Sequence, residues 1–395
     1  MRIGVDATCW TNRRGYGRFA RALLMAALKL DPGREYVFFT DDISPEFPLP
    51  SGVDVVRVET SVATVKAAAA DGARTPGDML AVSRAISARE LDLIFFPSVY
   101  SFVPILHSAP LLVTIHDVIP ERFPELVFPT LRGKMFWRAK VALACAQARL
   151  ILTVSEYSRR CLAQDLRISP RKLRVVSEAG DPAFTRLDSF DLSPLFQKLS
   201  LPRGTRFLAY VGGFSPHKNL IALIGWFSAV LRSPGFDDVR LVLVGDYQGD
   251  PFFSCYPMLQ RQIQKHGLES RVLFPGYMRD DDLRLMFHAA TALVLPSMCE
   301  GFGLPAVEAA ACGTPVLVTT ESPLPEILGE GALAIAPDNS QGWVESLTRV
   351  LSDADLRNRM SAAGMRAASG LSWRAAAAQL LEIFDEVTQR RAPAA

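Results

Sequence analysis

The strongest constraint on the fold of this chain is a regular alternation of short apolar runs with longer helical patterns. Several short runs in the first half read as strands, and helical stretches such as 17–30 and 156–163 lie between them. Parallel neighbouring strands need such a crossover between them, and it is nearly always right-handed. The alternation therefore predicts a parallel, doubly wound sheet. Its expected strands are 2–6, 36–40, 53–58, 93–96, 111–115, 150–154 and 173–176.

A stretch rich in proline and glycine interrupts this alternation between residues 181 and 204. We predict a linker at 186–204, between a first domain at 1–185 and a second domain at 205–370. The expected fold class is α/β, with two Rossmann-like doubly wound domains facing across a cleft, and ligands at the carboxyl ends of the strands. The second domain repeats the alternation, with strands expected at 207–211, 240–244, 272–274, 292–295 and 315–319.

The last segment of the chain, 371–395, contains a predicted amphipathic helix at 373–390 with Ala, Leu, Ile and Phe on one face. Such an apolar stripe needs a surface to pack on. One interpretation is that this helix crosses back onto the first domain.

Composition narrows the class of protein. With 395 residues and 49% hydrophobic content, the chain can bury large cores. Lys and Arg number 43 and Asp and Glu number 41, a balance that gives no overall field for nucleic acid. The six cysteines include no C-x-x-C pair, so we expect reduced thiols and a cytoplasmic location. Residues 93–115 carry no charge, but three prolines interrupt them, which favours two buried strands over a membrane span.

The segment 297–316, SMCEGFGLPAVEAAACGTPV, follows an apolar strand and places two glutamates around a glycine-rich turn. The glycines let the backbone turn tightly and approach a ligand, and Pro305 suits the first turn of a helix. The free N–H groups at a helix start bind anions such as a diphosphate. Glu300 and Glu308 would then accept hydrogen bonds from ribose or sugar hydroxyls. The alternative for Glu308 is a purely structural role beside the helix dipole.

The motif EGFGLPAVEA, in which seven residues separate Glu300 from Glu308, closely resembles the E-x7-E motif of the retaining GT-B glycosyltransferases, in particular glycosyltransferase family 4. Other segments resemble the same family in the same order, so the resemblance covers nearly the whole chain. The donor half is similar in VGGFSPHKNL, LVLVGD, VLFPGYMRDDDLRLMF and CGTPVLVT, and the acceptor half in TIHDVIPERFPE and LTVSEYSRRCL.

This resemblance implies a retaining, metal-independent hexosyltransferase that moves a sugar from a nucleotide diphosphate donor to the hydroxyl of a glycan or lipid-linked glycan. HDVIPERFPE is most similar to mannosyltransferases of bacterial polysaccharide assembly, which implies GDP-mannose as the donor. The leaving diphosphate is expected to help deprotonate the acceptor, while the protein positions the reactants and stabilises charge. No cofactor, metal or nucleic-acid partner is expected.

The resemblance also implies which residues bind the donor. Lys218 would contact the diphosphate. Gly213 stands where many members have an arginine, so more of the diphosphate charge would rest on Lys218. The implied donor-binding residues are Gly212, Gly213, Lys218, Gly276, Tyr277, Glu300, Gly301, Phe302, Gly303, Leu304 and Glu308.

The implied catalytic residues are His116 and Glu300. His116 follows the strand expected at 111–115, where the resemblance implies contact with the transferred sugar. A histidine that hydrogen-bonds backbone at a strand end is the alternative. The resemblance assigns Gly15, Gly17 and Arg18, in NRRGYGRFAR, to the acceptor side.

Two alternatives to a glycosyltransferase stay open. Gly15, Gly17 and Ala20 also match a dinucleotide fingerprint, with the acidic Asp41 after the second strand, which would indicate an NAD(P)-dependent enzyme. Against this, the intervening residues 8–14 place the first glycine too far from the end of the first strand. A sugar-nucleotide-binding protein without catalysis is the other alternative.

Two further patterns bear on metals and membranes. The run 280–282, three aspartates, has the D-x-D pattern of metal-dependent glycosyltransferases, but its place before LRLMF predicts that Asp280 or Asp281 is a helix N-cap. The segment 132–140, RGKMFWRAK, mixes basic and aromatic residues. It favours either peripheral contact with an anionic inner membrane or a solvated helix face with Phe136 or Trp137 in the core.

Overall fold

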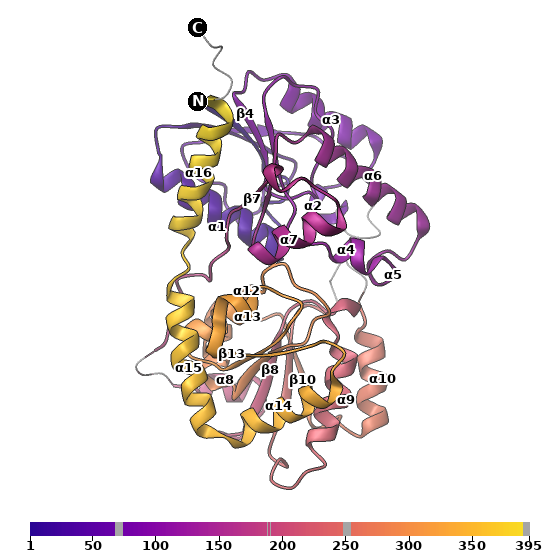
Figure 1. Cartoon of the computed structure of the whole chain (residues 1–395), viewed down its shortest axis with the longest axis vertical. Helices are drawn as coiled ribbons and strands as arrows, with labels where there is room; N and C mark the ends of the chain where they lie inside the picture. Colours follow the sequence, from indigo (N-terminus) through magenta and orange to yellow (C-terminus); the bar gives the residue numbers. More distant parts are fainter. Residues whose placement is uncertain (68–73, 188, 190, 248–253, 390–395) are drawn as a thin grey trace. The chain divides into compact units, whose positions relative to one another are not determined.

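The computed structural model describes residues 1–67, 74–187, 189, 191–247 and 254–389. The chain forms two compact units, one from Met1–Glu178 with Ser372–Ala395 and the other from Ala179–Leu371. Each unit contains a parallel sheet with helices packed against it (Figure 1). The predicted α/β class, with two Rossmann-like doubly wound units, is therefore confirmed.

The first unit holds a seven-stranded sheet in the order β3-β2-β1-β4-β5-β6-β7. Its strands match the predicted ones within one residue at either end, and all except the edge strands β3 and β7 are mainly buried. They are β1 Arg2–Asp6, β2 Glu35–Thr40, β3 Asp54–Arg57, β4 Leu93–Phe96, β5 Leu111–Thr114, β6 Leu150–Thr153 and β7 Leu173–Val175. The helices are α1 Gly15–Leu30, α2 Thr64–Ala67, α3 Pro76–Ser87, α4 Ile119–Arg122, α5 Pro124–Val127, α6 Leu131–Gln147, α7 Glu156–Asp165 and α16 Trp373–Gln389.

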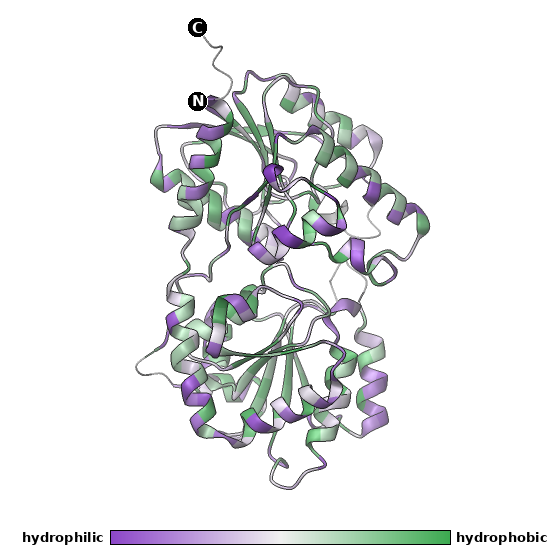
Figure 2. Cartoon of the chain, viewed as in Figure 1, coloured by the Kyte–Doolittle hydropathy of each residue, from purple (hydrophilic) through white to green (hydrophobic). Residues whose placement is uncertain are grey.

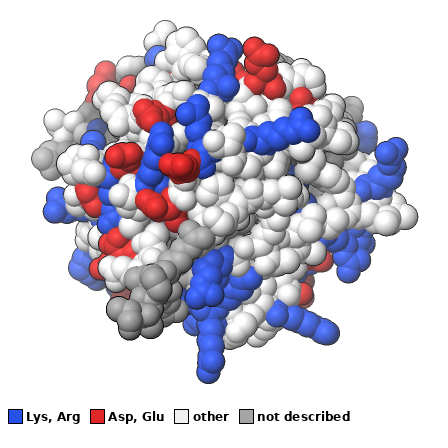
Figure 3. All heavy atoms as spheres, turned by 90° about the horizontal axis from the view of Figure 1, so that it is seen from above, with Lys and Arg blue, Asp and Glu red and all other residues white. Residues whose placement is uncertain are grey.

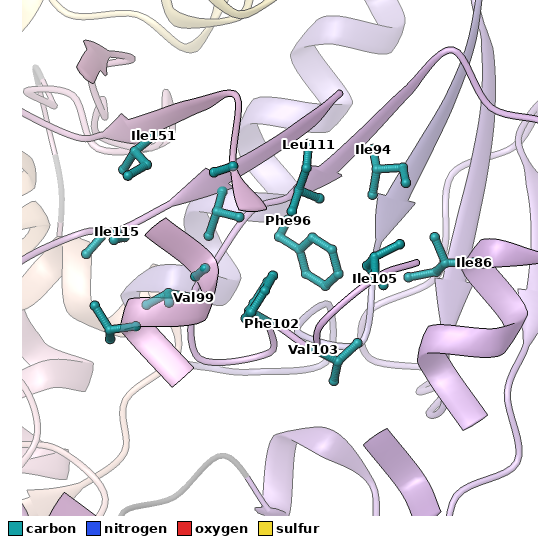
Figure 4. Packing of buried hydrophobic residues seen from close by; sticks show 14 of the residues in the cluster. Ile86, Ile94, Phe96, Val99, Phe102, Val103, Ile105, Leu111, Ile115 and Ile151 are labelled. Carbon is teal, nitrogen blue, oxygen red and sulfur yellow. The ribbon is translucent and has the colours of Figure 1, made fainter. Parts of the chain in front are cut away.

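Strand β4 shows how the two faces of this sheet are covered. Successive side chains of a strand point to opposite faces. The ring of Phe95 packs 5.6 Å from Phe384 of α16, while the ring of Phe96 packs 5.3 Å from Phe102. The second contact belongs to a large apolar cluster that α3, α6 and α7 complete on that face (Figure 4). The segment between β4 and β5 is thus anchored in the core, and it positions the residues that follow β5.

The second unit has a six-stranded sheet in the order β10-β9-β8-β11-β12-β13. The sequence predicted five of these strands and missed β13, an edge strand. The strands are β8 Phe207–Val211, β9 Arg240–Val244, β10 Val272–Gly276, β11 Ala292–Leu295, β12 Val316–Thr319 and β13 Ala332–Ile335. The helices are α8 Ser193–Lys198, α9 Leu220–Val230, α10 Tyr256–His266, α11 Asp280–Ala289, α12 Leu304–Ala311, α13 Leu324–Leu328, α14 Ser340–Ser352 and α15 Ala354–Ser369.

The division between the units differs from the predicted one. It falls after Glu178 rather than after residue 185, and the predicted linker 186–204 lies inside the second unit. Part of that linker forms α8, because Leu195 and Phe196 are apolar enough to be buried against the second unit. The physical reason for the difference is that proline opens a short helix here instead of ending one.

The final helix α16 belongs to the first unit, where it packs along α1 (Figure 1). Arg34 pairs with Asp385 at 2.8 Å, and Arg174 pairs with Glu386 at 2.9 Å. These pairs flank the buried stripe of α16 that the sequence showed as amphipathic. The last residue of the predicted helix, Arg390, lies outside the described residues.

The distribution of hydrophobic and charged residues agrees with one buried core in each unit. In Figure 2 the strands of both sheets are mostly hydrophobic, and hydrophilic residues lie on the helices and loops around them. Figure 3 views the chain from above, and there Asp and Glu gather mainly at the upper left while Lys and Arg project more widely. Among the described residues, no helix is both long and apolar enough to cross a membrane.

Candidate functional site

The most organised polar site of the second unit lies where β8 and β11 end. Lys218 closes the short 3-10 turn after β8, and Glu300 lies in the loop after β11. The Lys218 Nζ atom is 2.7 Å from Oε1 of Glu300. The Oγ atom of Ser297 donates to the same carboxylate oxygen at 2.5 Å. One glutamate oxygen therefore joins a buried serine to the lysine.

Two backbone contacts hold these loops in place. The N–H of Met298 donates to the carbonyl of His217 at 2.8 Å, and the N–H of Glu300 donates to the carbonyl of Glu321 at 2.9 Å. Glu300 is only 7% exposed, so its carboxylate and the Lys218 ammonium interact with little screening by water. A lysine has three donor hydrogens, which leaves Lys218 able to contact an anionic ligand without leaving Glu300.

Helix α12 begins shortly after Glu300 in the sequence. Gly303 is its N-cap and has a φ of +93°, and a Cβ atom there would lie 2.7 Å from the Leu324 side chain. Only glycine fits both conditions. The first N–H groups of a helix can bind phosphate oxygens. In the first turn of α12, Pro305 has no N–H, and the Ala306 N–H donates to the carbonyl of Gly303 at 2.9 Å.

Glu308 lies in the middle of α12 and is 1% exposed. Its Oε1 atom accepts a long hydrogen bond, 3.5 Å, from the backbone N–H of Asp181. Gly180 permits this approach, because a Cβ atom at Gly180 would already lie 3.3 Å from Cγ of Glu308. A carboxylate buried this deeply needs hydrogen-bond partners, because removing its charge from water without them costs free energy.

Three of the glycines predicted to bind the donor, Gly212, Gly213 and Gly276, lie at the carboxyl ends of β8 and β10. The Gly212 N–H donates to the carbonyl of Val244 at 3.0 Å, and the Gly245 N–H donates to the carbonyl of Gly276 at 3.1 Å. A Cβ atom at Gly245 would be 2.0 Å from the Gly212 carbonyl, so these strand ends approach closely. Gly213 is fixed by its carbonyl, which accepts from the Tyr210 hydroxyl at 2.6 Å.

The other predicted donor residues divide by exposure. Tyr277 is 51% exposed beside the end of β10, so its side chain is accessible to a ligand. Phe302 and Leu304 are buried in the unit, so they can offer only backbone groups. Gly301 lies between Glu300 and these residues in the same loop.

The aspartates 280–282 are not arranged as the sequence predicted. The N-cap of α11 is Arg279, without a side-chain hydrogen bond, and all three aspartates lie in the first turn, where they complement the helix dipole. Asp282 also pairs with Lys198 at 2.6 Å. The predicted cap by Asp280 or Asp281 is therefore wrong. In the described part of the chain, no three His, Cys, Asp or Glu side chains are grouped so that they could hold a metal ion.

In the first unit, His116 follows β5 and is 8% exposed. Its Nε2 atom is 3.0 Å from the Pro97 carbonyl, and its Nδ1 atom is 3.5 Å from Oε1 of Glu178. The ring of Phe19 meets the imidazole edge-on at 4.8 Å. The contact with Pro97 is the backbone hydrogen bond that the structural alternative predicted. Contact of His116 with a sugar stays a prediction.

Glu178, and not the neighbouring Asp117, orients this imidazole. Asp117 accepts a hydrogen bond from the N–H of Ile119, the first residue of α4, at 2.9 Å. His116 and Asp117 both lie beyond the end of β5, and the Asp117 carboxylate is engaged with the start of α4. Because Pro97 and Glu178 both present acceptor oxygens, an imidazolium can donate to both, whereas a neutral ring can donate to one.

Two further carboxyl groups of the first unit have a raised pKa, one at the end of β1 and one in α4. Burial raises the pKa of Asp6, which ends β1, to about 6. Its Oδ1 atom accepts from the Thr8 hydroxyl at 2.7 Å. Burial likewise raises the pKa of Glu121 to about 7, and its Oε1 atom accepts from Nε1 of Trp137 at 2.7 Å.

The glycine loop predicted on the acceptor side leads into α1. Gly15 and Arg18 lie in the first turn of this helix. A Cβ atom at Gly17 would come 2.1 Å from the Asn12 carbonyl, so this position needs glycine, whereas a Cβ atom at Gly15 would meet open space. The glycine at position 17 therefore serves close packing of the loop rather than approach to a pyrophosphate.

The NAD(P)-dependent alternative needs an acidic side chain that is available to bind a ribose, and Asp41 is already engaged elsewhere. Asp41 is engaged by α2, because its Oδ2 atom accepts from the backbone N–H of Thr64 at 2.7 Å and from the Thr64 hydroxyl at 2.5 Å. In a dinucleotide fold, this carboxylate would bind the ribose hydroxyls. The structure thus gives Asp41 a structural role.

Two residues of these sites escaped the sequence analysis. Ser297 is two residues beyond β11, and Glu178 is three residues beyond β7. Each follows a strand at its carboxyl end, and that position was the available signal. Neither belongs to a recognisable motif, so the signal was too general to select them.

Comparison with known proteins covers both units. The family model for glycosyl transferases group 1 matches residues 193–367, and the model for Glycosyltransferase Family 4 matches residues 15–184. The chain is 27% identical over 278 residues to the O-antigen chain mannosyltransferase B of Escherichia coli, with 69% of each chain covered.

Two other relatives are similar over shorter stretches. The O-antigen chain mannosyltransferase RfbU of Salmonella typhimurium is 28% identical over 249 residues, covering 62% of this chain and 63% of the relative. The D-inositol 3-phosphate glycosyltransferase of Corynebacterium efficiens is 29% identical over 223 residues, covering 55% and 52%. The match with the latter two thus spans less than two thirds of their length.

Solved structures share the fold. Sucrose-phosphate synthase from Thermosynechococcus elongatus has a TM-score of 0.75 at 19% identity, with 99% of this chain and 100% of that chain covered. Anabaena Alr3699/HepE in complex with UDP and glucose has a TM-score of 0.72 at 20% identity, covering 98% and 100%. Because the two family models account for both units and the fold agrees, the chain belongs to the GT-B glycosyltransferases of group 1 and family 4.

Proposed function

We propose that this protein transfers a sugar from a nucleotide diphosphate to an acceptor hydroxyl with retention of the anomeric configuration. The donor is GDP-mannose, and the acceptor is a glycan or lipid-linked glycan of bacterial cell-surface polysaccharide assembly. The names of the Escherichia coli and Salmonella typhimurium relatives, both O-antigen chain mannosyltransferases, support this choice of sugar. Peripheral association with the cytoplasmic face of the inner membrane is part of the same proposal.

The observation that carries the proposal is the arrangement of Lys218, Glu300 and α12. Lys218 is held by Glu300 at 2.7 Å, and α12 begins at the strained turn of Gly303. A diphosphate would take its hydrogen bonds from Lys218 and from the first N–H groups of α12. Glu308, one turn into the helix, would accept hydrogen bonds from the ribose hydroxyls. Gly212, Gly213, Gly276 and Tyr277 complete the donor site.

In the proposed reaction, the bond from the anomeric carbon to the diphosphate oxygen breaks, and the bond to the acceptor oxygen forms on the same face of the sugar. The acceptor proton passes to the leaving diphosphate. Positive charge that develops on the sugar ring, and negative charge on the diphosphate, must be stabilised by groups already in place. Glu300 fixes Lys218 for the diphosphate, and His116 contacts the transferred sugar. Gly15, Gly17 and Arg18 belong to the acceptor side.

The experiment that tests this function is a thermal-shift screen of the protein against GDP, GDP-mannose, UDP, UDP-glucose and NAD. A ligand that binds only the native state raises the melting temperature. GDP and GDP-mannose should give the largest shifts. A shift with NAD alone would restore the dinucleotide alternative. Binding of GDP-mannose without any transfer to glycan acceptors would favour the non-catalytic alternative, and the anomeric configuration of the product by NMR tests retention.

Transfer should need no divalent metal. The diphosphate charge is met by Lys218 and the start of α12, and a metal would need oxygen ligands grouped around it. We expect the initial rate to be the same in EDTA as in buffer with added Mg²⁺ or Mn²⁺. Loss of activity in EDTA that Mg²⁺ or Mn²⁺ restores would overturn this expectation and return attention to Asp280 and Asp282.

Ser297 should contribute to donor binding by holding Glu300. Ser297→Ala removes the hydrogen bond to Glu300 and frees its carboxylate to rotate away from Lys218. We expect affinity for GDP to fall only about threefold to tenfold, because the lost hydrogen bond affects the ligand indirectly, through Glu300 and Lys218. The measurement is titration calorimetry.

A matched control is Ser322→Ala. Ser322 is also buried beyond a strand of the same sheet, and its hydroxyl donates to the Thr319 carbonyl at 2.8 Å. It should bind GDP as the unmodified protein does. Equal losses in both variants would show a general effect on folding rather than a role for Ser297.

A further inference from the structure

A short loop after β4 shapes the surroundings of His116 in the first unit. We call residues 97–101 the histidine loop. Its first residue, Pro97, presents its carbonyl to Nε2 of His116 at 3.0 Å. The N–H of Val99 donates to the carbonyl of Thr114, two residues before His116, at 2.8 Å. The position of this loop therefore determines the position of a hydrogen-bond partner of the imidazole.

Two cationic side chains from outside the loop hold its other end. Lys140 of α6 donates from Nζ to the carbonyl of Tyr100 at 2.8 Å. Arg74, two residues before α3, donates from Nη1 to the carbonyl of Ser101 at 2.7 Å. Arg74 is 6% exposed, and its Nε and Nη2 atoms have no hydrogen-bond partner among the described residues. Consecutive carbonyls of the histidine loop are thus held by two different parts of the chain.

Placing these two cations together costs free energy. Burial, and after it the charge of Arg74, lowers the pKa of Lys140 to about 7. The negative charge of Asp6, at the end of β1, acts in the opposite direction and favours the charged lysine. Buried charges contribute little net stability because their desolvation is costly, so packing alone does not account for this arrangement.

The histidine loop also contacts the acceptor side of the unit. The ring of Tyr100 stacks on the ring of Tyr16 in α1, with 5.3 Å between the ring centroids. Tyr16 lies between Gly15 and Gly17, which we assign to the acceptor side. A displaced histidine loop would therefore move a contact of His116 and a contact at the start of α1 together.

We propose that Lys140 and Arg74 are positioning residues for the transfer reaction, which hold the histidine loop so that His116 meets the transferred sugar in one fixed orientation. They act through the backbone and touch neither substrate. The inference rests on the proposed function, because it assigns two residues a role in the same site. A displacement of about 1 Å in a preorganised site is enough to lower a reaction rate about a hundredfold.

The first test compares Lys140→Met with the unmodified full-length protein. Methionine keeps an unbranched side chain but has no hydrogen to donate to Tyr100. We expect the turnover number to fall about tenfold to a hundredfold while affinity for GDP stays unchanged, because the residues assigned to the nucleotide belong to the other unit. Lys140→Arg, which retains a cationic donor, should recover most of the turnover.

A matched control is Lys172→Met. Lys172 also lies in the first unit, and its Nζ atom donates to the carbonyl of Cys145 in α6 at 2.5 Å. This variant loses the same kind of contact away from the histidine loop, so its turnover should equal that of the unmodified protein. Equal losses in Lys140→Met and Lys172→Met would overturn the positioning role.

An NMR measurement tests the positioning without an active enzyme. The chain has five histidines, and His116→Gln identifies the imidazole signals of His116 by their disappearance. These signals should shift in Lys140→Met and stay in place in Lys172→Met. Unshifted signals in a Lys140→Met protein that is folded by circular dichroism would overturn the proposal.

Arg74→Lys serves where Lys140→Met does not fold. It keeps the charge but loses the planar guanidinium that reaches Ser101, so it should shift the His116 signals and lower turnover in the same direction. Unchanged signals and turnover in this variant would count against the proposal. Failure of the proposed function is recognised separately, because it appears as absent binding of GDP-mannose, whereas the His116 signals respond to the loop alone.

Discussion

Glu308→Ala should weaken binding of the donor nucleotide by about tenfold to a hundredfold, which is the usual effect of losing hydrogen bonds to a charged group. Glu308 is 1% exposed and lies one turn into the helix whose start we assign to the diphosphate. Its carboxylate would accept from both ribose hydroxyls. The backbone of the helix does not depend on it, since alanine is the best helix former. We therefore expect a folded protein with a weakened site.

Calorimetry with GDP and circular dichroism on the same sample separate these effects. Glu308→Gln retains one acceptor oxygen and should fall between the unmodified protein and the alanine variant. Glu330→Ala, which removes an exposed glutamate of the same unit, is the control and should bind GDP normally. If Glu308→Ala bound GDP as tightly as the unmodified protein, Glu308 would be a structural residue of α12.

Most strands of the first unit could be predicted from sequence because they are apolar runs between polar turns, as β4 and β5 are. Strand β13, Ala332–Ile335, was missed because it is only four residues long and two of them are alanines, which have little preference for strands. The division between the units was misplaced for a different reason. Prolines 194 and 202 suggested a linker, whereas the apolar residues between them fold into the second unit as α8. Local turn chemistry was visible in the sequence, but the tertiary contacts that override it were not.

The candidate site could be predicted as far as its motif extends. Glu300, Glu308 and Lys218 were identified from glycine-rich turns and a family resemblance, and the structure joins two of them in an ion pair. Ser297 and Glu178 were missed, because their partners are 3 and 62 residues away and only the fold shows which side chains meet. Pairing across loops depends on strand order, which a sequence pattern predicts poorly.

His116→Ala should lower the turnover number by about a hundredfold or more, while affinity for GDP stays close to that of the unmodified protein. The magnitude is the usual cost of one preorganised contact to a transition state. The reason for the separation is that every residue assigned to the nucleotide belongs to the second unit, whereas His116 belongs to the first. His116 would stabilise the charged sugar by its position and not by covalent attack.

Glu178→Gln provides the more discriminating variant. Glu178 holds Nδ1 of His116 at 3.5 Å while Pro97 holds Nε2 at 3.0 Å, so the ring is oriented from both sides. If orientation matters, Glu178→Gln should lower turnover, because an amide holds the imidazole less firmly than a carboxylate does, and GDP affinity should not change. Unchanged turnover in His116→Ala would leave this histidine a structural element at the end of β5. Equal losses of turnover and GDP affinity would place it in the nucleotide site instead. Only a loss of turnover at constant affinity, shared by both variants, agrees with a role at the transferred sugar.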